Sequence, residues 1–211
     1  MQWSDTGIVL SARKHGETSA ILHVLTEQHG RHAGLVRGGA SRTRRGILQP
    51  GNELSLAWRA RLSEHLGTFT VEAGRARVAA VLHEPARLAA FAAACELVDS
   101  ALPERVPDVT GHRAFRALLE TIESDDAWPI AYARWEFALL AALGYAIDPT
   151  GADVPPFLAG QQAPDDPRGR TAAVRAALDL TGAHLPNALA DHKARLPARA
   201  RLVDRLARQS S

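Results

Sequence analysis

The residues before position 76 fall into short segments with the pattern of β-strands, separated by turn residues. Aliphatic and β-branched residues, which suit a pleated surface, dominate these segments. The expected strands cover residues 7–13, 19–26, 32–37, 54–61 and 66–72. Short strands with no helical period between them predict a small barrel of the OB type.

The pattern changes near residue 77, where alanine and leucine become frequent and apolar residues recur every three or four positions. The expected helices cover residues 85–102, 111–122, 130–143, 171–181 and 197–208, with a further helix after Pro186. Prolines and glycines crowd residues 148–170, which predicts an irregular loop. The predicted fold class is α+β, with an OB-fold domain over residues 1–76 and an α-helical domain over residues 77–211.

The most basic part of the chain is the segment 37–46, between the third and fourth expected strands. It contains three glycines, no acidic residue and four arginines: Arg37, Arg42, Arg44 and Arg45. Guanidinium groups match phosphate oxygens with forked donors, and glycines let the backbone approach a ligand closely. We therefore expect a basic, flexible loop that binds a polyanion; a merely solvated surface loop is the alternative.

Positive charge is concentrated in the N-terminal part of the chain. Residues 1–80 contain 11 Lys+Arg and 6 Asp+Glu, a net +5, whereas residues 81–211 contain 14 and 17, a net −3. Further basic residues expected to support phosphate binding are Arg13, Lys14, Arg31, Arg59 and Arg61. Arg31 lies in an expected turn, and a period of two places Arg59 and Arg61 on one strand face. Because aromatic residues are scarce here, backbone electrostatics rather than base stacking should dominate, with strong salt dependence.

Signatures of catalysis are missing from the sequence. It contains no GxxxxGK[ST] or GxGxxG loop, no HExxH and no nucleophile elbow. The close pair His29 and His32 has no acidic or cysteine partner nearby in the sequence, so we expect no metal site there. These observations favour a binding protein over an enzyme.

The single cysteine, Cys95, lies among alanines, where a small core residue is expected. One cysteine excludes an intramolecular disulfide, as is common in a reducing compartment. The first residues lack the basic and apolar regions of a secretory signal, and the longest apolar run, residues 88–95, is too short to span a membrane. We therefore expect a soluble cytoplasmic protein.

Several segments, in order along nearly the whole chain, are shared with one family. In the first half they are Gly7–Leu10, Gly16–Ser19, Leu25–Gly30, Gly34–Arg42 and Leu48–Pro50. In the second half, Arg134–Tyr145 looks like an RFExxLLxxLGY helix with Trp135 in place of the usual phenylalanine, and Leu196–Asp204 is similar to the family's ending. Together these segments resemble RecO, the bacterial DNA-repair and recombination mediator.

The resemblance implies an OB-fold joined to a helical domain, without catalytic turnover or a cofactor. It also implies binding of single- and double-stranded DNA, annealing of complementary strands and association with RecR. With RecR, such proteins help to load a RecA-type recombinase onto DNA coated by single-strand-binding protein. By position, the arginines of segment 37–46 become the leading DNA contacts, supported by the other basic residues of the barrel.

Relatives of this kind also dock the acidic, Phe-ending tail of single-strand-binding protein, which needs an apolar slot and a cation for its carboxylate. The candidates, beside Phe115 and Leu139, are Arg113, Arg116 and Arg134, with ordinary surface arginines as the alternative. Many relatives bind zinc through cysteines after the LGY segment. Residues 146–156 contain no cysteine, so we expect no zinc here.

Two other functions stay open at this point. An RNA-binding OB protein would use the same basic surface and would prefer RNA to DNA. A protein-interaction adaptor would keep its arginines solvated and would show no salt-sensitive binding to DNA.

Overall fold

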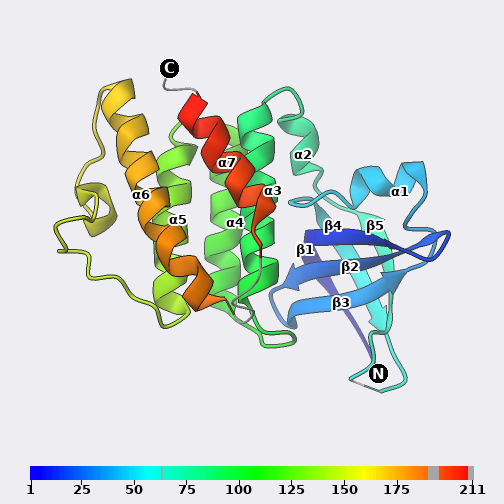
Figure 1. The fold of residues 1–211 in the computed structure, drawn as a ribbon. Coiled ribbons are helices and arrows are strands. Elements are labelled where there is room, and N and C mark those ends of the chain that lie inside the picture. The colour runs from blue at the N-terminus through cyan, green and yellow to red at the C-terminus, as the bar shows by residue number, and fades with distance from the viewer. Residues whose placement is uncertain (63, 190–194, 209–211) are drawn as a thin grey trace.

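The structure is a computed structural model that describes residues 1–62, 64–189 and 195–208. A five-stranded barrel forms the N-terminal part, and a bundle of helices packs beside it (Figure 1). The barrel is closed, with the strand order β1, β2, β3, β5, β4. The predicted α+β class, with an OB-like barrel followed by helices, is confirmed.

The strands are β1 (Gln2–His15), β2 (Ser19–Thr26), β3 (Gly30–Val36), β4 (Glu53–Arg59) and β5 (Thr68–Ala73). β1 begins before the predicted strand because its polar first residues pair with β4, while its second half pairs with β2. A parallel contact between Leu35 and Thr68 closes the barrel. Inward side chains such as Val9, Leu22 and Trp58 are buried and form the barrel core.

The helices are α1 (Arg42–Ile47), α2 (Arg77–Ala80), α3 (Pro85–Ala101), α4 (Val109–Ser124), α5 (Trp128–Ala142), α6 (Pro167–Ala188) and α7 (Pro197–Arg208), with a 3-10 turn η1 (Pro156–Ala159). α3 packs against β1, α4 and α7 and so lies between the barrel and the outer helices (Figure 1). Ile8 and Leu10, on the outer face of β1, join the core of the helical part. In the part of the chain that the structure describes, no helix is long and apolar enough to cross a bilayer.

The predicted helix boundary at Pro186 is wrong, because α6 runs continuously through this residue. Pro186 has no N–H to donate to the carbonyl of Gly182, so one intrahelical hydrogen bond is lost, and only two residues of α6 follow it. α6 also begins at Pro167, and η1 interrupts the irregular segment before it.

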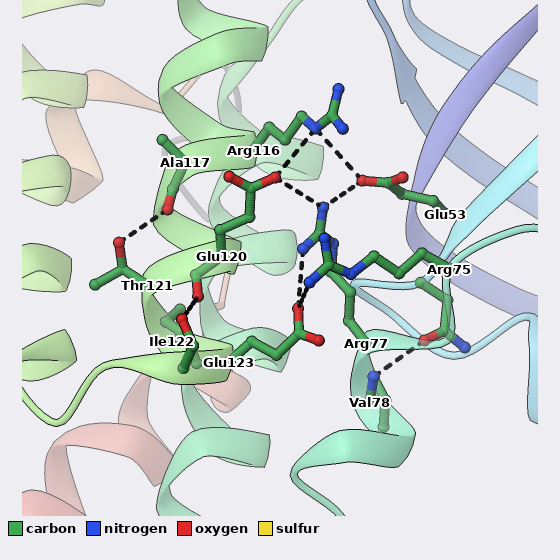
Figure 2. Close-up of polar contacts among 12 residues, drawn as sticks. Glu53, Arg75, Arg77, Val78, Arg116, Ala117, Glu120, Thr121, Ile122 and Glu123 are labelled. Atoms are coloured by element: carbon green, nitrogen blue, oxygen red, sulfur yellow. Dashed lines mark hydrogen bonds and ion pairs between the residues drawn. The ribbon is translucent and has the colours of Figure 1, made fainter.

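A buried guanidinium joins the barrel to the helices. Arg77, at the start of α2, is fully buried and donates hydrogen bonds to Glu53 of β4 and, over 3.0 Å, to Glu123 of α4 (Figure 2). Glu120 lies 3.4 Å from the same guanidinium. Burial opposes the charge, but the bonds to Glu53 and Glu123 outweigh it and raise the pKa of Arg77. The barrel and the helical bundle are therefore linked by a charged contact as well as by apolar packing.

Candidate nucleic-acid interface

The basic segment 37–46 is a turn followed by a short helix, so the prediction of a flexible loop is wrong. Gly38 has φ of 69°, a left-handed conformation that turns the chain after β3. Ser41 then caps α1, since its side chain accepts a hydrogen bond from the Arg44 amide at 3.4 Å. Leu48, directly after α1, is buried in the barrel core and anchors the helix.

Three of the four arginines of this segment are exposed, and the fourth is half-buried against the barrel. α1 has no buried residue, and Arg37, Arg42 and Arg45 are exposed. Arg44 is half-buried, with Nη1 3.5 Å from the Val71 carbonyl oxygen of β5. Within the described residues, none of these four arginines forms an ion pair with a carboxylate. Their charge is free to attract phosphates.

A first basic depression, here called the α1 notch, lies between β1 and α1. It has a volume of about 410 Å³, and its charged lining residues are Lys14 of β1 and Arg45 of α1. The turn residues Gly39 and Ala40 form part of its wall. Arg13 is exposed on β1 but does not line the notch. The sequence-predicted cations Lys14 and Arg45 are thus brought together, although they are far apart in the chain.

A second basic depression, here called the N-terminal groove, consists of two adjoining pockets of about 590 and 600 Å³. The pockets share Gln2, Arg59 and Thr68, and together they include the chain's first residue and several cations but no aspartate or glutamate. The lining residues whose side chains can carry positive charge are Arg37, Arg59, Arg61 and His65.

The prediction that Arg59 and Arg61 share a strand face is wrong, because β4 ends at Arg59 and Arg61 lies beyond it. Both nevertheless line the same pocket of the N-terminal groove. Arg59 is held there by a hydrogen bond from Nη2 to the Gln2 side-chain oxygen, 3.2 Å long. Gln2, His65 and Thr68 are lining residues that the sequence did not single out. In β5, polar residues alternate with apolar ones, and this pattern was the one signal that could have placed Thr68 on the outer face of the barrel.

Arg31 lies inside β3 rather than in a turn. Its Nε donates to the Leu102 carbonyl oxygen at 2.7 Å, and its Nη1 lies 3.2 Å from Asp99 of α3. Glu104 is 3.7 Å away. The predicted contact of Arg31 with DNA stays a prediction, but its guanidinium holds β3 against the end of α3 and its charge is already compensated.

His29 and His32 belong to an aromatic cluster at one end of the barrel. The His29 ring stacks on Trp3 with 4.0 Å between centroids, and its Nδ1 lies 3.3 Å from Asp5, an acidic neighbour that the sequence spacing did not reveal. Burial, and to a smaller extent Arg105, lower the pKa of His32 to about 4. No group of three or more metal-binding side chains occurs among the described residues.

The helical part has an apolar pocket of about 340 Å³ between α3, α4 and α5. Phe115, Trp135, Leu139 and Leu143 line it, and Asp108 is the single charged residue in its lining among those that the structure describes. The apolar slot expected beside Phe115 and Leu139 therefore has a physical counterpart in the structure.

The arginines predicted to accompany this slot have different surroundings, and none of them lines the pocket. The side chain of Arg113 is 76% exposed. Arg116 pairs with Glu120 one turn along α4 at 3.3 Å. Arg134 donates from Nε to the Phe157 carbonyl oxygen at 3.2 Å, and so ties η1 to α5. Arg113 also has a carboxylate neighbour, since its Nη2 lies 3.8 Å from Glu27, but this is the longest of the three contacts.

The segment after Tyr145 does not fit a zinc ion. Asp148 accepts hydrogen bonds from the amide and hydroxyl groups of Thr150, at 2.9 and 2.7 Å, and these bonds lower its pKa. Residues 146–156 offer only this carboxylate and Asp153, whereas zinc needs about four ligands rich in sulfur or imidazole. Val154 and Phe157 are instead buried and hold the segment by packing.

The barrel topology and its outward-facing arginines define an OB-fold protein with an attached helical part. Comparison with known families gives a match for the barrel and a second match for the helical part. Residues 1–76 match the family described as "Recombination protein O N terminal", and residues 82–150 match "Recombination protein O C terminal". The chain belongs to the RecO family of DNA repair proteins.

Curated relatives agree with this assignment. The chain is 50% identical over 148 residues to "DNA repair protein RecO" of Ruegeria sp. (strain TM1040), covering 70% of this chain and 61% of the relative. It is 49% identical to the protein of the same name from Rhodospirillum centenum, and the match covers 70% of this chain and 59% of the relative. The chain is also 50% identical to the protein of the same name from Cereibacter sphaeroides (strain ATCC 17029 / ATH 2.4.9), over 71% of this chain and 62% of the relative. The chain thus spans about three fifths of the length of the curated relatives it matches.

Proposed function

We propose that this protein binds single- and double-stranded DNA through the basic surface of its barrel. The observation that carries the proposal is the group of outward-facing arginines in and before α1 that have no carboxylate partner among the described residues. Guanidinium groups in this state neutralise phosphates without first breaking an internal ion pair. Membership of a DNA repair family supports DNA as the polyanion. The leading contacts are Arg37, Arg42, Arg44 and Arg45.

We infer that the bound state serves strand annealing, without chemical turnover. Two complementary strands repel each other through their phosphates, and a protein that neutralises both removes much of this barrier. Contacts to phosphates and sugars do not read sequence, so any complementary pair can be annealed. This activity fits a mediator that works at the bacterial nucleoid and helps to load a RecA-type recombinase together with a RecR-like partner.

The acidic C-terminal tail of single-strand-binding protein is the second proposed ligand. The apolar pocket beside Phe115 and Leu139 suits a terminal aromatic side chain, since it is lined by Trp135 and other apolar residues. Arg113, exposed on the neighbouring surface of α4, is the leading candidate for the carboxylate. Arg116 and Arg134 are weaker candidates because their own contacts are shorter: Arg116 lies 3.3 Å from Glu120 and Arg134 donates to η1 at 3.2 Å, whereas Arg113 lies 3.8 Å from Glu27.

The direct experiment is fluorescence anisotropy with labelled oligonucleotides at several salt concentrations. Binding of single-stranded DNA should weaken with salt, with a log–log slope of about 0.7 per neutralised phosphate. Stronger binding to single-stranded RNA of the same sequence would identify an RNA-binding protein instead. Absence of binding to either polymer at low salt would leave an adaptor function and would refute the proposal.

A further inference from the structure

We propose that one copy of the barrel has two separate DNA sites, the N-terminal groove and the α1 notch, and that each holds its own strand. This inference rests on the proposed function and adds to it the location of each strand. A mediator that anneals DNA needs both strands at once, and two sites on one chain would provide this without oligomerisation.

The two depressions are distinct surfaces. They share no lining residue. The groove contains the first residues of β1 and the notch contains Ser11 and Lys14 near its other end. At about 3.3 Å per residue, Gln2 and Lys14 are separated by roughly 40 Å of strand contour. In Figure 1 the N-terminus and α1 accordingly lie at opposite ends of the barrel.

Their charge makes both depressions suitable for phosphates. Every charged side chain that lines either one is cationic or can become so. Carboxylates that would repel a strand are present elsewhere on the barrel but line neither depression. Arg59 and Arg61 supply fixed positive charge to the groove, and Lys14 and Arg45 supply it to the notch.

The sites approach each other at one place, the turn after β3. Arg37 lines the groove, whereas Gly39 and Ala40 line the notch. Two strands bound in this way would run close together at the turn while their remaining lengths stayed apart. Such a crossing brings a short stretch of bases within reach for the first pairing, and Arg37 would offset the repulsion between the two backbones there.

Stoichiometry tests this inference directly. The 211-residue chain is mixed with excess oligothymidine of about eight nucleotides, a length within the range one OB fold binds. Thymidine strands cannot pair with each other, so each bound strand occupies a site. Native mass spectrometry should show two strands per chain. The double variant Arg59→Ala/Arg61→Ala should bind one strand, and so should Lys14→Ala/Arg45→Ala.

The matched control is Arg201→Ala/Arg205→Ala, which removes two exposed arginines from α7 and should leave two strands bound. Thermal melting of each variant checks that the fold persists. If one strand binds per chain and both barrel variants lower its affinity, a single strand crosses both depressions. The proposal of DNA binding would then stand, and the two-site inference would fail. Two strands unaffected by either variant would also overturn it. No binding by the unaltered chain would instead refute the proposed function itself.

Discussion

Arg199 of α7 is paired with Glu136 of α5 in the interior of the helical part. Its Nη2 lies 2.6 Å from Oε1 of Glu136 and its Nε lies 3.0 Å from Oε2, so the contact is bidentate. Glu136 is fully buried, and Thr181 of α6 also donates a hydrogen bond to it. Glu96 of α3 accepts hydrogen bonds from the first amides of α7. Two carboxylates therefore fix the last helix to the rest of the bundle.

Replacement of Arg199 by alanine should lower the free energy of unfolding by about 3–5 kcal/mol, because it leaves the Glu136 carboxylate buried without its cation. Arg201→Ala, on an exposed position of the same helix, should change it by less than about 0.5 kcal/mol. Urea unfolding followed by circular dichroism measures both. Equal midpoints for the two variants would contradict the structural role of the pair.

Arg77→Ala should weaken the contact between barrel and helices by about 3 kcal/mol, because it removes a fully buried guanidinium and leaves Glu53 and Glu123 with only Arg116 and Arg75 as cations. The neighbouring Arg75 is a useful control, since it is half exposed and pairs with Glu123 over 3.0 Å on the surface (Figure 2). Arg75→Ala should cost no more than about 1 kcal/mol. The prediction fails if Arg75→Ala is as harmful as Arg77→Ala in chemical denaturation.

His32 should make the protein sensitive to mild acid. Its pKa falls from the ordinary 6.5 to about 4 in the folded state, so the unfolded chain binds more protons between these values. The stabilisation is complete above pH 6.5 and is lost as pH falls towards 4, by up to about 3 kcal/mol. His32→Phe, which keeps the aromatic contacts, should flatten this part of the stability curve. An unchanged curve would show that His32 is not buried as described.

Cys95 should be inert in the folded protein. Its thiol is fully buried on α3, lies 3.4 Å from the Val9 carbonyl oxygen, and has its pKa raised by burial. A thiol reagent such as dithionitrobenzoate should react with it only after unfolding, at a rate that follows the opening of the native state. Rapid stoichiometric reaction under native conditions would contradict this packing.

Local patterns in the sequence were sufficient to predict most strands of the barrel. Alternating residues define strands such as β4, where every second side chain enters the core. The same rule missed the start of β1, where Gln2 to Thr6 are polar except for Trp3 and are stabilised by pairing with β4 rather than by a continuous apolar face. It also missed α1, which has no buried side chain and depends on its Ser41 cap and on Leu48.

Charged residues were harder to assign because their partners are distant in the chain. Arg31 and Asp99 are separated by 68 positions, and Arg199 and Glu136 by 63. A basic residue in the sequence has the same appearance whether it faces solvent or a buried carboxylate. Only the packing of α3 and α5 decides that Arg31 and Arg199 are internal cations while Arg42 and Arg45 face outward.

The variant Arg42→Ala/Arg44→Ala/Arg45→Ala shows whether the basic surface at α1 binds DNA. Its affinity for labelled single-stranded DNA is compared with that of Arg201→Ala/Arg205→Ala/Arg208→Ala, which removes the same charge from α7. The α1 variant should bind more weakly, with the log–log salt slope reduced by about 2 for three lost phosphate contacts. Unchanged affinity and slope in a folded α1 variant would contradict it.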